Sequence, residues 1–372
     1  MSQNKMIYLC NIISDAERDH FYFADSALKK IRGYKKILEE NGVDITTLSL
    51  SSPKRAFFQK QDGTLTEDAA SRMKYYLHRL IFEVARLIRY MAYLTRERKH
   101  YTTIMTYSYT TYNVLLACFG HYMLGKKIVL DYEDGLFCNR TRHRYYSFLE
   151  KIILKISSGC VLINTGLRKR LPEYMAYTVI NGIFLSNGNP ACHHKMSGSE
   201  KFSILYSGEL NFDYGLSLLF QLFSQPGAEQ IDFHITGSGD NEEELLEFIQ
   251  KNPLQNVTFH GYVPLSTLKD LEARTDGFAL CQNEDSPIYH TNFPSKLFHY
   301  LGSGKPVFFN QCSLFDEYES FENAFPIENM ENGVNEILDM LKHREKYCPN
   351  VASGIKQHTE DSVRKLKTIL FA

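Results

Sequence analysis

Short apolar runs alternate with helical segments along the whole chain, and this alternation stops once and then resumes. In the first half the apolar runs are MIYLCNII, VDITTLSL, TIMTYS, KIVLDY, CVLINT and TVINGI. Between them, apolar residues recur at helical spacing near residues 27–40, 68–98, 112–124 and 142–156. Because strands joined by helices pair in parallel and are covered on both faces, the pattern predicts an α/β chain.

The interruption falls at residues 185–201, which are rich in Gly, Ser, Asn and charged residues and form the predicted linker. After it the apolar runs are FSILYSG, IDFHITG, VTFHGYV, GFALCQN and PVFFNQ, and helices are expected near residues 216–224, 334–346 and 362–370. We therefore predict two Rossmann-like doubly wound domains, residues 1–184 and 202–355, that face a cleft. Residues 356–372 are expected to form a helix that packs back on the first domain. Ligands of such sheets bind beyond the carboxyl ends of the strands.

Charge and cysteine content exclude some classes of function. The 42 Lys and Arg against 43 Asp and Glu give a formal net charge of −1, which does not support nucleic-acid binding. The eight cysteines are scattered without a Cys-x-x-Cys pair, as is typical of core thiols in an intracellular protein. The N-terminus does not resemble a signal peptide, and no apolar run is long enough to span a bilayer. We therefore expect a cytoplasmic protein. CHHK, Cys192–Lys195, is too isolated to predict a metal site.

Glycines follow two of the predicted strands in the second half. Gly208 allows a ligand to approach the backbone closely, and Gly237 and Gly239 permit tight turns with positive φ. A single Gly-x-Gly after a strand is weak evidence, because many strand ends look like this.

A more specific pattern is NFPSKLFHYLGSGKPVFF, in which Pro294 suits the first turn of a helix that ends at residues 302–304. The N–H groups of Ser295, Lys296 and Leu297 are expected to point out of the helix start. There the helix dipole and the Lys296 ammonium attract anions. The pattern also suits an ordinary helix start with a solvated lysine, and local chemistry does not decide between the two.

An ordered set of motifs resembles the donor half of retaining family-4 glycosyltransferases. The set is ILYSGELNFDYGLSLLFQLF, FHITGSGD, VTFHGYVPLSTLKDLEARTDGFALCQN and NFPSKLFHYLGSGKPVF. The resemblance covers residues 202–310 well and extends more loosely to KIVLDYEDG and TVINGI. It implies the GT-B fold, and a metal-independent transfer of a hexose from a UDP- or GDP-sugar that requires no cofactor. By analogy, the acceptor is a polysaccharide or a lipid-linked oligosaccharide.

The candidate donor-site residues that the resemblance implies follow the strands and the helix start of the second half. They are Gly208, Glu209, Gly237, Tyr262, Val263, Ser295, Lys296, Leu297 and His299. The base would lie between Tyr262 and Val263, and the pyrophosphate would meet Gly208 and the helix start.

Four positions depart from the charged pattern that members of this family often have. Glu209 and Tyr214 stand where Arg and Lys are usual, and Thr291 and His299 stand where two glutamates are usual. Phosphate binding then depends more on backbone N–H groups and on Lys296. His299 can still hydrogen-bond a ribose hydroxyl as a neutral donor and acceptor.

The loop QNEDSPIYHTN precedes the helix start and faces the transferred sugar in the family. Glu284, Asp285, Ser286 and His290 are therefore candidates to bind sugar hydroxyls, and His290 is a candidate catalytic residue. The alternative is an ordinary polar loop.

Acidic residues end a strand of the first half, in KIVLDYEDG. Asp131, Glu133 and Asp134 lie at its carboxyl end, where the cleft is expected. Glu133 or Asp134 is predicted to orient the acceptor hydroxyl or to act as the base. The alternative is that Asp134-Gly135 only makes a turn. The arginines of the next segment, NRTRHR, either hold a phosphate of a lipid-linked acceptor or form a solvated helix face.

The long helix expected at residues 68–98 is basic and amphipathic. Apolar residues recur along it at helical spacing: Leu77, Leu80, Ile81, Val84, Leu87, Ile88 and Met91. Residues 72–99 contain eight Lys or Arg and two acids. Core packing is the commoner use of such a stripe, and peripheral contact with the inner face of a membrane is the alternative.

The sequence thus predicts a glycosyltransferase that binds a nucleotide sugar and a glycan or lipid-linked acceptor. A catalytically silent GT-B subunit that binds a partner or glycan, and a GT-B sugar-nucleotide epimerase, remain alternatives. A dinucleotide-dependent dehydrogenase is disfavoured because no Gly-x-Gly-x-x-Gly follows the first strand.

Overall fold

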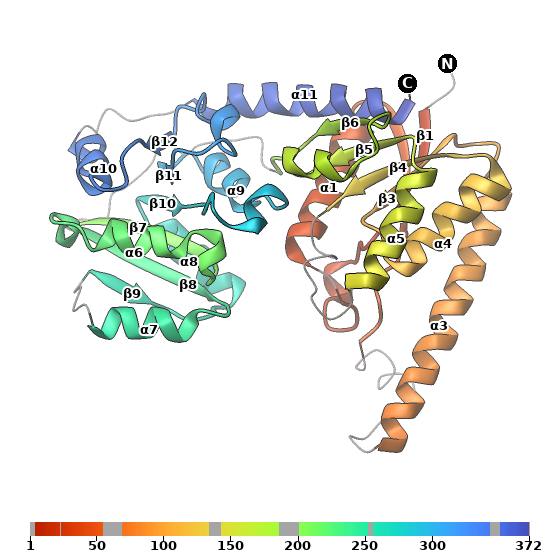
Figure 1. Ribbon diagram of the computed structural model, residues 1–372, viewed down its shortest axis with the longest axis horizontal. Coiled ribbons are helices and arrows are strands. Elements are labelled where there is room, and N and C mark those ends of the chain that lie inside the picture. The colour runs from red at the N-terminus through yellow and green to blue at the C-terminus, as the bar shows by residue number, and fades with distance from the viewer. Residues whose placement is uncertain are drawn as a thin grey trace. The chain divides into compact units, whose positions relative to one another are not determined.

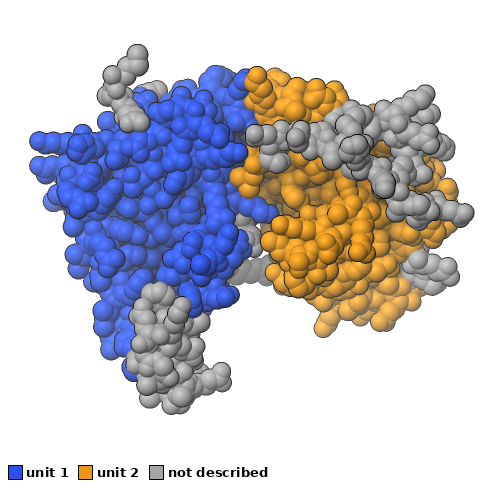
Figure 2. Space-filling model, turned by 180° about the vertical axis from the view of Figure 1, so that it is seen from behind, with its two compact units in different colours: residues 1–183, 359–372 blue, residues 184–358 orange. Residues whose placement is uncertain are grey.

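The computed structural model describes residues 4–22, 24–54, 69–133, 143–185, 201–251, 256–342 and 350–371. The chain divides into two compact units, residues 1–183 with 359–372 (unit 1) and residues 184–358 (unit 2) (Figures 1 and 2). Each unit is built on its own six-stranded parallel sheet with flanking helices. The prediction of an α/β chain with two doubly wound sheets is therefore confirmed. The predicted linker lies almost entirely outside the described residues.

Unit 1 has the strand order β2-β1-β3-β4-β5-β6. Its strands are β1 (Asn4–Cys10), β2 (Val43–Ser49), β3 (Thr103–Tyr107), β4 (Lys127–Tyr132), β5 (Gly159–Leu162) and β6 (Ala176–Val179). Its helices are α1 (Asp25–Glu40), α3 (Ala69–Arg96), α4 (Thr111–Cys118) and α5 (His143–Ile156), and a π-helical turn, Phe119–Met123, follows α4. The order β2-β1-β3 places a reversal of chain direction between β1 and β3.

One face of the unit 1 sheet packs on two helices that lie far apart in the sequence. Met6, Tyr8 and Cys10 alternate along β1 towards this face, where Ile31 of α1 and Leu366 of α11 complete the core. Helix α11 (Val351–Phe371) begins in unit 2 and ends in unit 1. Because alternate strand residues point to opposite faces, Ile7 and Leu9 are buried on the other side of the sheet.

Unit 2 has the strand order β12-β11-β10-β7-β8-β9. Its strands are β7 (Phe202–Glu209), β8 (Ile231–Ser238), β9 (Val257–Phe259), β10 (Gly277–Leu280), β11 (Val307–Asn310) and β12 (Ala324–Ile327). Its helices are α6 (Leu216–Phe223), α7 (Glu242–Lys251), α8 (Leu265–Arg274), α9 (Lys296–Gly302) and α10 (Gly333–Lys342), together with the first part of α11. Leu219 and Phe223 of α6 and Val334 of α10 pack on Ile204 and Phe233 of the sheet.

Two features of unit 2 were not expected. Strand β12 was missed because Pro326 interrupts a short run; a proline is tolerated there since β12 is the edge strand of its sheet. Helix α11 begins at Val351, earlier than the expected C-terminal helix within residues 356–372. The polar segment with Gly354 does not look helical, but a Cβ at Gly354 would lie 2.9 Å from the Phe321 ring, so this glycine permits close packing.

Candidate functional site

The strand order of unit 2 marks one point on its sheet as a ligand site. Chain direction reverses at β7, because β8 and β9 follow on one side and β10 to β12 on the other. In doubly wound sheets, ligands bind beyond the carboxyl ends of the strands at such a reversal. Ser207, Gly208 and Glu209 end β7 at this point.

Strands β7 and β10 separate before β7 ends. Their ladder pairs Ile204 with Gly277 and Leu205 with Phe278. Beyond that pair, the Tyr300 hydroxyl of α9 accepts from the Ser207 N–H at 3.1 Å and donates to the Ser207 carbonyl at 3.2 Å. The Tyr300 ring stacks on Phe278 with centroids 4.2 Å apart. Helix α9 therefore holds the end of β7 where no neighbouring strand pairs with it on that side.

Lys296 reaches the same strand end from the first turn of α9. Its Nζ donates to Ser207 Oγ at 2.7 Å, one residue before Gly208. The structure thus brings together two predicted parts of the site, the turn after β7 and the start of α9.

One detail of the predicted helix start is wrong. The Leu297 amide donates to the Pro294 carbonyl at 2.9 Å, so this N–H is used within the first turn. The reason is that Ser295 already has helical dihedral angles, φ −55° and ψ −18°, which closes the first turn early. Leu297 contributes a buried side chain instead. Ser295 and Lys296 remain the candidate donors to a phosphate at this turn.

Gly237 is required to be glycine by the neighbouring strand. It pairs with Gly208 in the ladder and has a φ of +147°. A Cβ built on Gly237 would lie 1.8 Å from the Gly208 carbonyl oxygen. Its own amide donates to the Gly261 carbonyl at 3.0 Å. Gly237 therefore packs against Gly208 at the end of β7 and bonds to Gly261 after β9, which holds the turns after β7, β8 and β9 together. A direct contact between Gly237 and a ligand stays a prediction.

Glu209 gives the rim of the site a negative charge. Partial burial and the nearby Asp240 carboxylate raise the pKa of Glu209 above its ordinary value, although the side chain is exposed. Two neighbouring acids repel a diphosphate. We therefore expect an anion to approach from the side of Lys296.

The loop after β9 carries an exposed aromatic ring. The Gly261 carbonyl accepts from the Gly237 amide and, at 2.7 Å, from the Thr236 hydroxyl, which fixes the loop beside the end of β8. Tyr262 is 81% exposed, and Val263 is half-buried. A large exposed ring on a loop whose backbone is hydrogen-bonded to β8 suits stacking on a flat ligand.

The loop after β10 is tied to the protein through its own polar groups. Tyr289 donates to Glu284 at 2.9 Å, and Ser286 donates to Asp213 at 3.1 Å. Glu284 and Ser286, predicted to bind sugar hydroxyls, are thus hydrogen-bonded within the protein. His290 is exposed and lies edge-on to Tyr289, with ring centroids 5.3 Å apart.

His299 is directed towards α8. Its Nε2 lies 2.9 Å from Glu272 Oε1, and its ring is exposed. A ligand hydroxyl would have to compete with Glu272 for this nitrogen. The predicted contact between His299 and a ribose stays a prediction.

A buried cluster of charges lies at the carboxyl end of β4 in unit 1. Asp131 accepts from the Tyr8 hydroxyl at 2.6 Å and from Lys30 Nζ at 2.8 Å, and Lys30 also pairs with Glu133. Burial alone would lower the pKa of Lys30, but the two carboxylates outweigh it and raise that pKa well above its ordinary value. Glu133 is therefore held in an ion pair with Lys30. Asp134, the other predicted base, lies outside the described residues.

Sequence reasoning missed three residues that shape these sites. Lys30 lies among the apolar residues of α1, which is the signal that could have marked it as buried and paired. Tyr300 looks like a simple core residue, because nothing in the sequence shows that a hydroxyl must satisfy Ser207. Ser108 directly follows β3 and has a φ of +59°, and its N–H donates to the Asp131 carbonyl at 2.8 Å.

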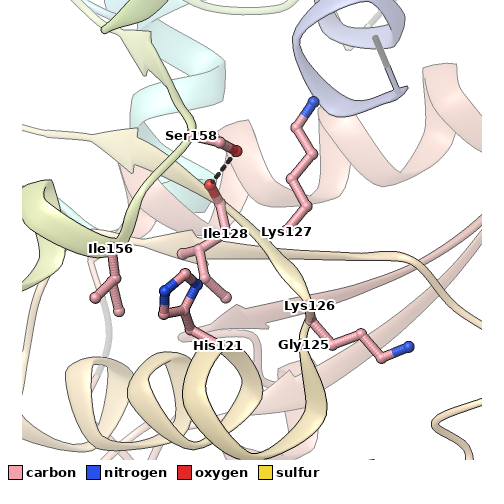
Figure 3. A pocket seen from close by; sticks show the side chains of 7 residues that line it. All are labelled: His121, Gly125, Lys126, Lys127, Ile128, Ile156 and Ser158. Carbon is pink, nitrogen blue, oxygen red and sulfur yellow. Dashed lines mark hydrogen bonds between the residues drawn. The ribbon is translucent and has the colours of Figure 1, made fainter.

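A pocket of about 300 Å³ lies elsewhere in unit 1 (Figure 3). Lys127 and Ile128 line it, and Lys127 is the first residue of β4. Ser158 donates to the Ile128 carbonyl at 3.0 Å at its rim. The pocket is therefore at the amino end of β4, opposite the edge at which doubly wound sheets bind ligands. Within the described ranges, no three or more His, Cys, Asp or Glu side chains form a group that could hold a metal ion.

Comparison with known families finds a match in the second half of the chain. Residues 194–352 match the family model described as "Glycosyl transferases group 1". The matched segment covers most of unit 2, including the turns after β7, β8 and β9 and the whole of α9. A search of curated proteins gives no match to the sequence.

Solved structures share the fold over nearly the whole chain. The catalytic domain of starch synthase IV from Arabidopsis thaliana, bound to ADP and acarbose, has a TM-score of 0.62 at 10% identity and covers 99% of both chains. Anabaena Alr3699/HepE in complex with UDP-glucose has a TM-score of 0.58 at 13% identity, over 98% of this chain and 96% of that chain. The lipopolysaccharide outer core galactosyltransferase WaaB has a TM-score of 0.57 at 12% identity, over 98% and 100%. At these identities the likeness establishes the fold, which is the GT-B architecture of two Rossmann-like sheets.

Proposed function

We propose that this chain, whose C-terminal unit carries a Glycosyl transferases group 1 domain, transfers a hexose from a nucleoside-diphosphate sugar to a hydroxyl of a glycan or a lipid-linked acceptor. The observation that carries the proposal is the position of Lys296. Its ammonium lies at the end of β7, where the chain direction of the sheet reverses, beside a glycine turn and a helix start.

The chemistry of the leaving group explains why a lysine is needed there. As the glycosidic bond breaks, negative charge develops on the departing diphosphate. Lys296 donates to the neutral Ser207 hydroxyl in this structure, and a phosphate oxygen is a stronger acceptor than a hydroxyl. A preorganised ammonium beside the Ser295 and Lys296 amides stabilises the developing charge. We infer from this that the transfer proceeds without a metal ion and, by analogy with family-4 enzymes, with retention.

The remaining donor contacts are proposed from the arrangement of the loops. Tyr262 and Val263 are proposed to flank the base, with UDP and GDP as the expected nucleotides. The proposal is supported by the exposed Tyr262 ring, which follows Gly261, the residue whose carbonyl accepts from the Gly237 amide. His299 is proposed to contact the ribose by exchanging Glu272 for a hydroxyl. His290 is proposed to lie near the transferred sugar.

The acceptor side of the proposal rests on unit 1. Glu133, with Asp134 next to it in the sequence, is proposed to orient the acceptor hydroxyl, and Lys30 pairs with the Glu133 side chain. We place the reaction in the cytoplasm, with peripheral contact to the inner face of a membrane if the acceptor is lipid-linked.

A catalytically silent subunit is the second candidate. The observation that favours it is that predicted catalytic and ribose-binding groups are already paired, Glu133 with Lys30 and His299 with Glu272. Such a subunit would bind a glycan or a partner protein and no nucleotide.

A screen of donors by thermal shift tests the proposal. UDP, GDP and ADP are added to the full chain, and the nucleotide that binds is expected to raise the melting temperature, because it binds only the native state. The corresponding nucleotide sugar should then release its nucleoside diphosphate only when a glycan or lipid-linked acceptor is added. No stabilisation by any nucleotide would favour the silent subunit. Conversion of the nucleotide sugar to its epimer without an acceptor would favour an epimerase.

A further inference from the structure

Helix α3 presents an apolar face to solvent. Six residues at helical spacing, which we call the α3 apolar face, are each between 44% and 71% exposed: Met73, Leu77, Leu80, Ile81, Val84 and Ile88. The helix lies at the edge of unit 1, and one end projects past α4 and α5 (Figure 1). The expectation that the predicted stripe packs in the core is therefore wrong for Leu77, Leu80, Ile81, Val84 and Ile88. Exposed apolar area of this extent on one helix marks a surface that another molecule covers.

The opposite face of α3 attaches the helix to unit 1 through polar groups. Arg86 is buried, pairs with Glu83 and donates to the Ser51 carbonyl at 2.7 Å. Tyr90 donates to the Ser49 carbonyl at 2.8 Å. These contacts explain why the apolar stripe faces outward. The end of β2 and the residues that follow it present backbone carbonyls to α3, and Arg86 and Tyr90, which bind them, take the inward positions.

The charges beside the α3 apolar face are basic. Lys74 and Arg89 each follow an apolar-face residue and so lie about 100° around the helix from it, at the border of the face. The two acids of residues 72–99, Glu83 and Glu97, are both ion-paired with an arginine. The whole chain has a net charge of only −1, so the basic excess of this helix is local.

These observations favour an anionic lipid surface as the occupant. Within the described part of the chain, no helix is long and apolar enough to cross a membrane, so α3 would lie in the interface. A second copy of the chain is disfavoured, because a two-fold contact through this face would bring two basic borders together. We propose that unit 1 docks on anionic bilayers through the α3 apolar face, with Lys74 and Arg89 at the level of the lipid headgroups. The inference holds whether or not the glycosyl-transfer proposal is right.

Co-sedimentation of the full chain with vesicles tests the proposal. We expect binding to vesicles of phosphatidylcholine mixed with phosphatidylglycerol, little binding to pure phosphatidylcholine, and weaker binding as salt is raised. The double variant Leu77→Glu/Ile81→Glu should bind at least about tenfold more weakly, since it removes apolar contact and adds repulsion. Leu246→Glu, at an exposed position on α7 of unit 2, is the matched control and should bind like the wild type.

Two further measurements make the outcome decisive. The melting temperature of the double variant should equal that of the wild type, because both side chains are exposed; a large decrease would show that the face is packed and overturn the proposal. Equal binding by the double variant and the wild type, or no preference for anionic vesicles, would also overturn it. If the wild type is a dimer and the double variant is a monomer, the proposal is also overturned, because the molecule that covers the face would then be a second copy of the chain.

Discussion

Gly237 shows how one residue can be required by the fold of a site and not by its ligand. The lack of a side chain there lets β8 approach the Gly208 carbonyl and positions the loop that carries Tyr262. The sequence marks Gly208 as a place where a ligand can approach the backbone and Gly237 as suited to a tight turn. It does not show that the two glycines face each other across the ladder. That contact depends on strand register, which only the folded sheet defines.

Gly237→Ala is expected to destabilise unit 2 by at least about 3 kcal/mol, because the Cβ overlaps the Gly208 carbonyl and the backbone has a positive φ. Gly261→Ala is the matched control, since Gly261 has a φ of +65° but nothing within 4 Å of its Cβ position. It should cost only about 1–2 kcal/mol of backbone strain. Urea denaturation of both variants measures the difference in their free energies of unfolding. Equal losses would show that the backbones of Gly208 and Gly237 do not pack this closely.

Helix α9 illustrates what the element scale adds. The sequence predicted where this helix starts and stops, and the structure confirms it: α9 spans Lys296–Gly302, and Gly304 has a φ of +75°. The sequence could not show that the Tyr300 hydroxyl bonds to the N–H and carbonyl of Ser207, where β10 separates from β7. Such a bond joins residues 93 positions apart, beyond the reach of any local pattern.

Tyr300→Phe should therefore lower the stability of unit 2. The variant keeps the ring stacked on Phe278 but leaves the buried Ser207 N–H and carbonyl without the hydroxyl, a loss of about 1–3 kcal/mol. We expect the melting temperature to fall by roughly 2–10 °C. Tyr122→Phe, at an exposed position in unit 1, should change it little. An unchanged melting temperature for Tyr300→Phe would mean that water replaces the hydroxyl.

Strand β8 and the turn after β9 share a pair of histidines with a predictable pH response. His234 Nδ1 lies 3.1 Å from His260 Nε2; burial, and for His234 also the charge of His260, lowers the pKa of both below the ordinary histidine value. The unfolded chain then binds more protons than the folded protein as the pH falls through about 6.5. Stability is therefore lost as the pH falls, and it is retained above that value.

The double variant His234→Gln/His260→Gln should lose less stability than the wild type between pH 8 and pH 5. Melting temperatures across this range give the comparison, and the other histidines, which both proteins share, cancel in the difference. Parallel profiles would show that this pair does not titrate differently in the folded and unfolded states.

At the scale of the whole molecule, the two sheets differ in order although the sequence pattern of both halves is the same. Unit 1 reverses direction between β1 and β3, and unit 2 between β7 and β10. The alternation of strands and helices could be read from local periodicity, so the sequence predicted both doubly wound sheets. The order of the strands could not be read in this way, because it depends on packing between segments that are distant in the sequence. Likewise Lys296 was predicted from its local motif, but its contact with Ser207 and the burial of Lys30 with Asp131 required the fold.

The central claim is that Lys296 binds the diphosphate of a nucleotide at the end of β7. Isothermal titration with the nucleotide that stabilises the protein, using wild type and Lys296→Met, tests it most directly. Methionine keeps the apolar stem and removes the charge, so we predict a loss of about 1.5–3 kcal/mol, or roughly 10- to 150-fold in Kd. Lys251→Met, which removes an exposed ammonium on α7, should leave Kd unchanged. A Kd for Lys296→Met equal to that of the wild type would contradict the account.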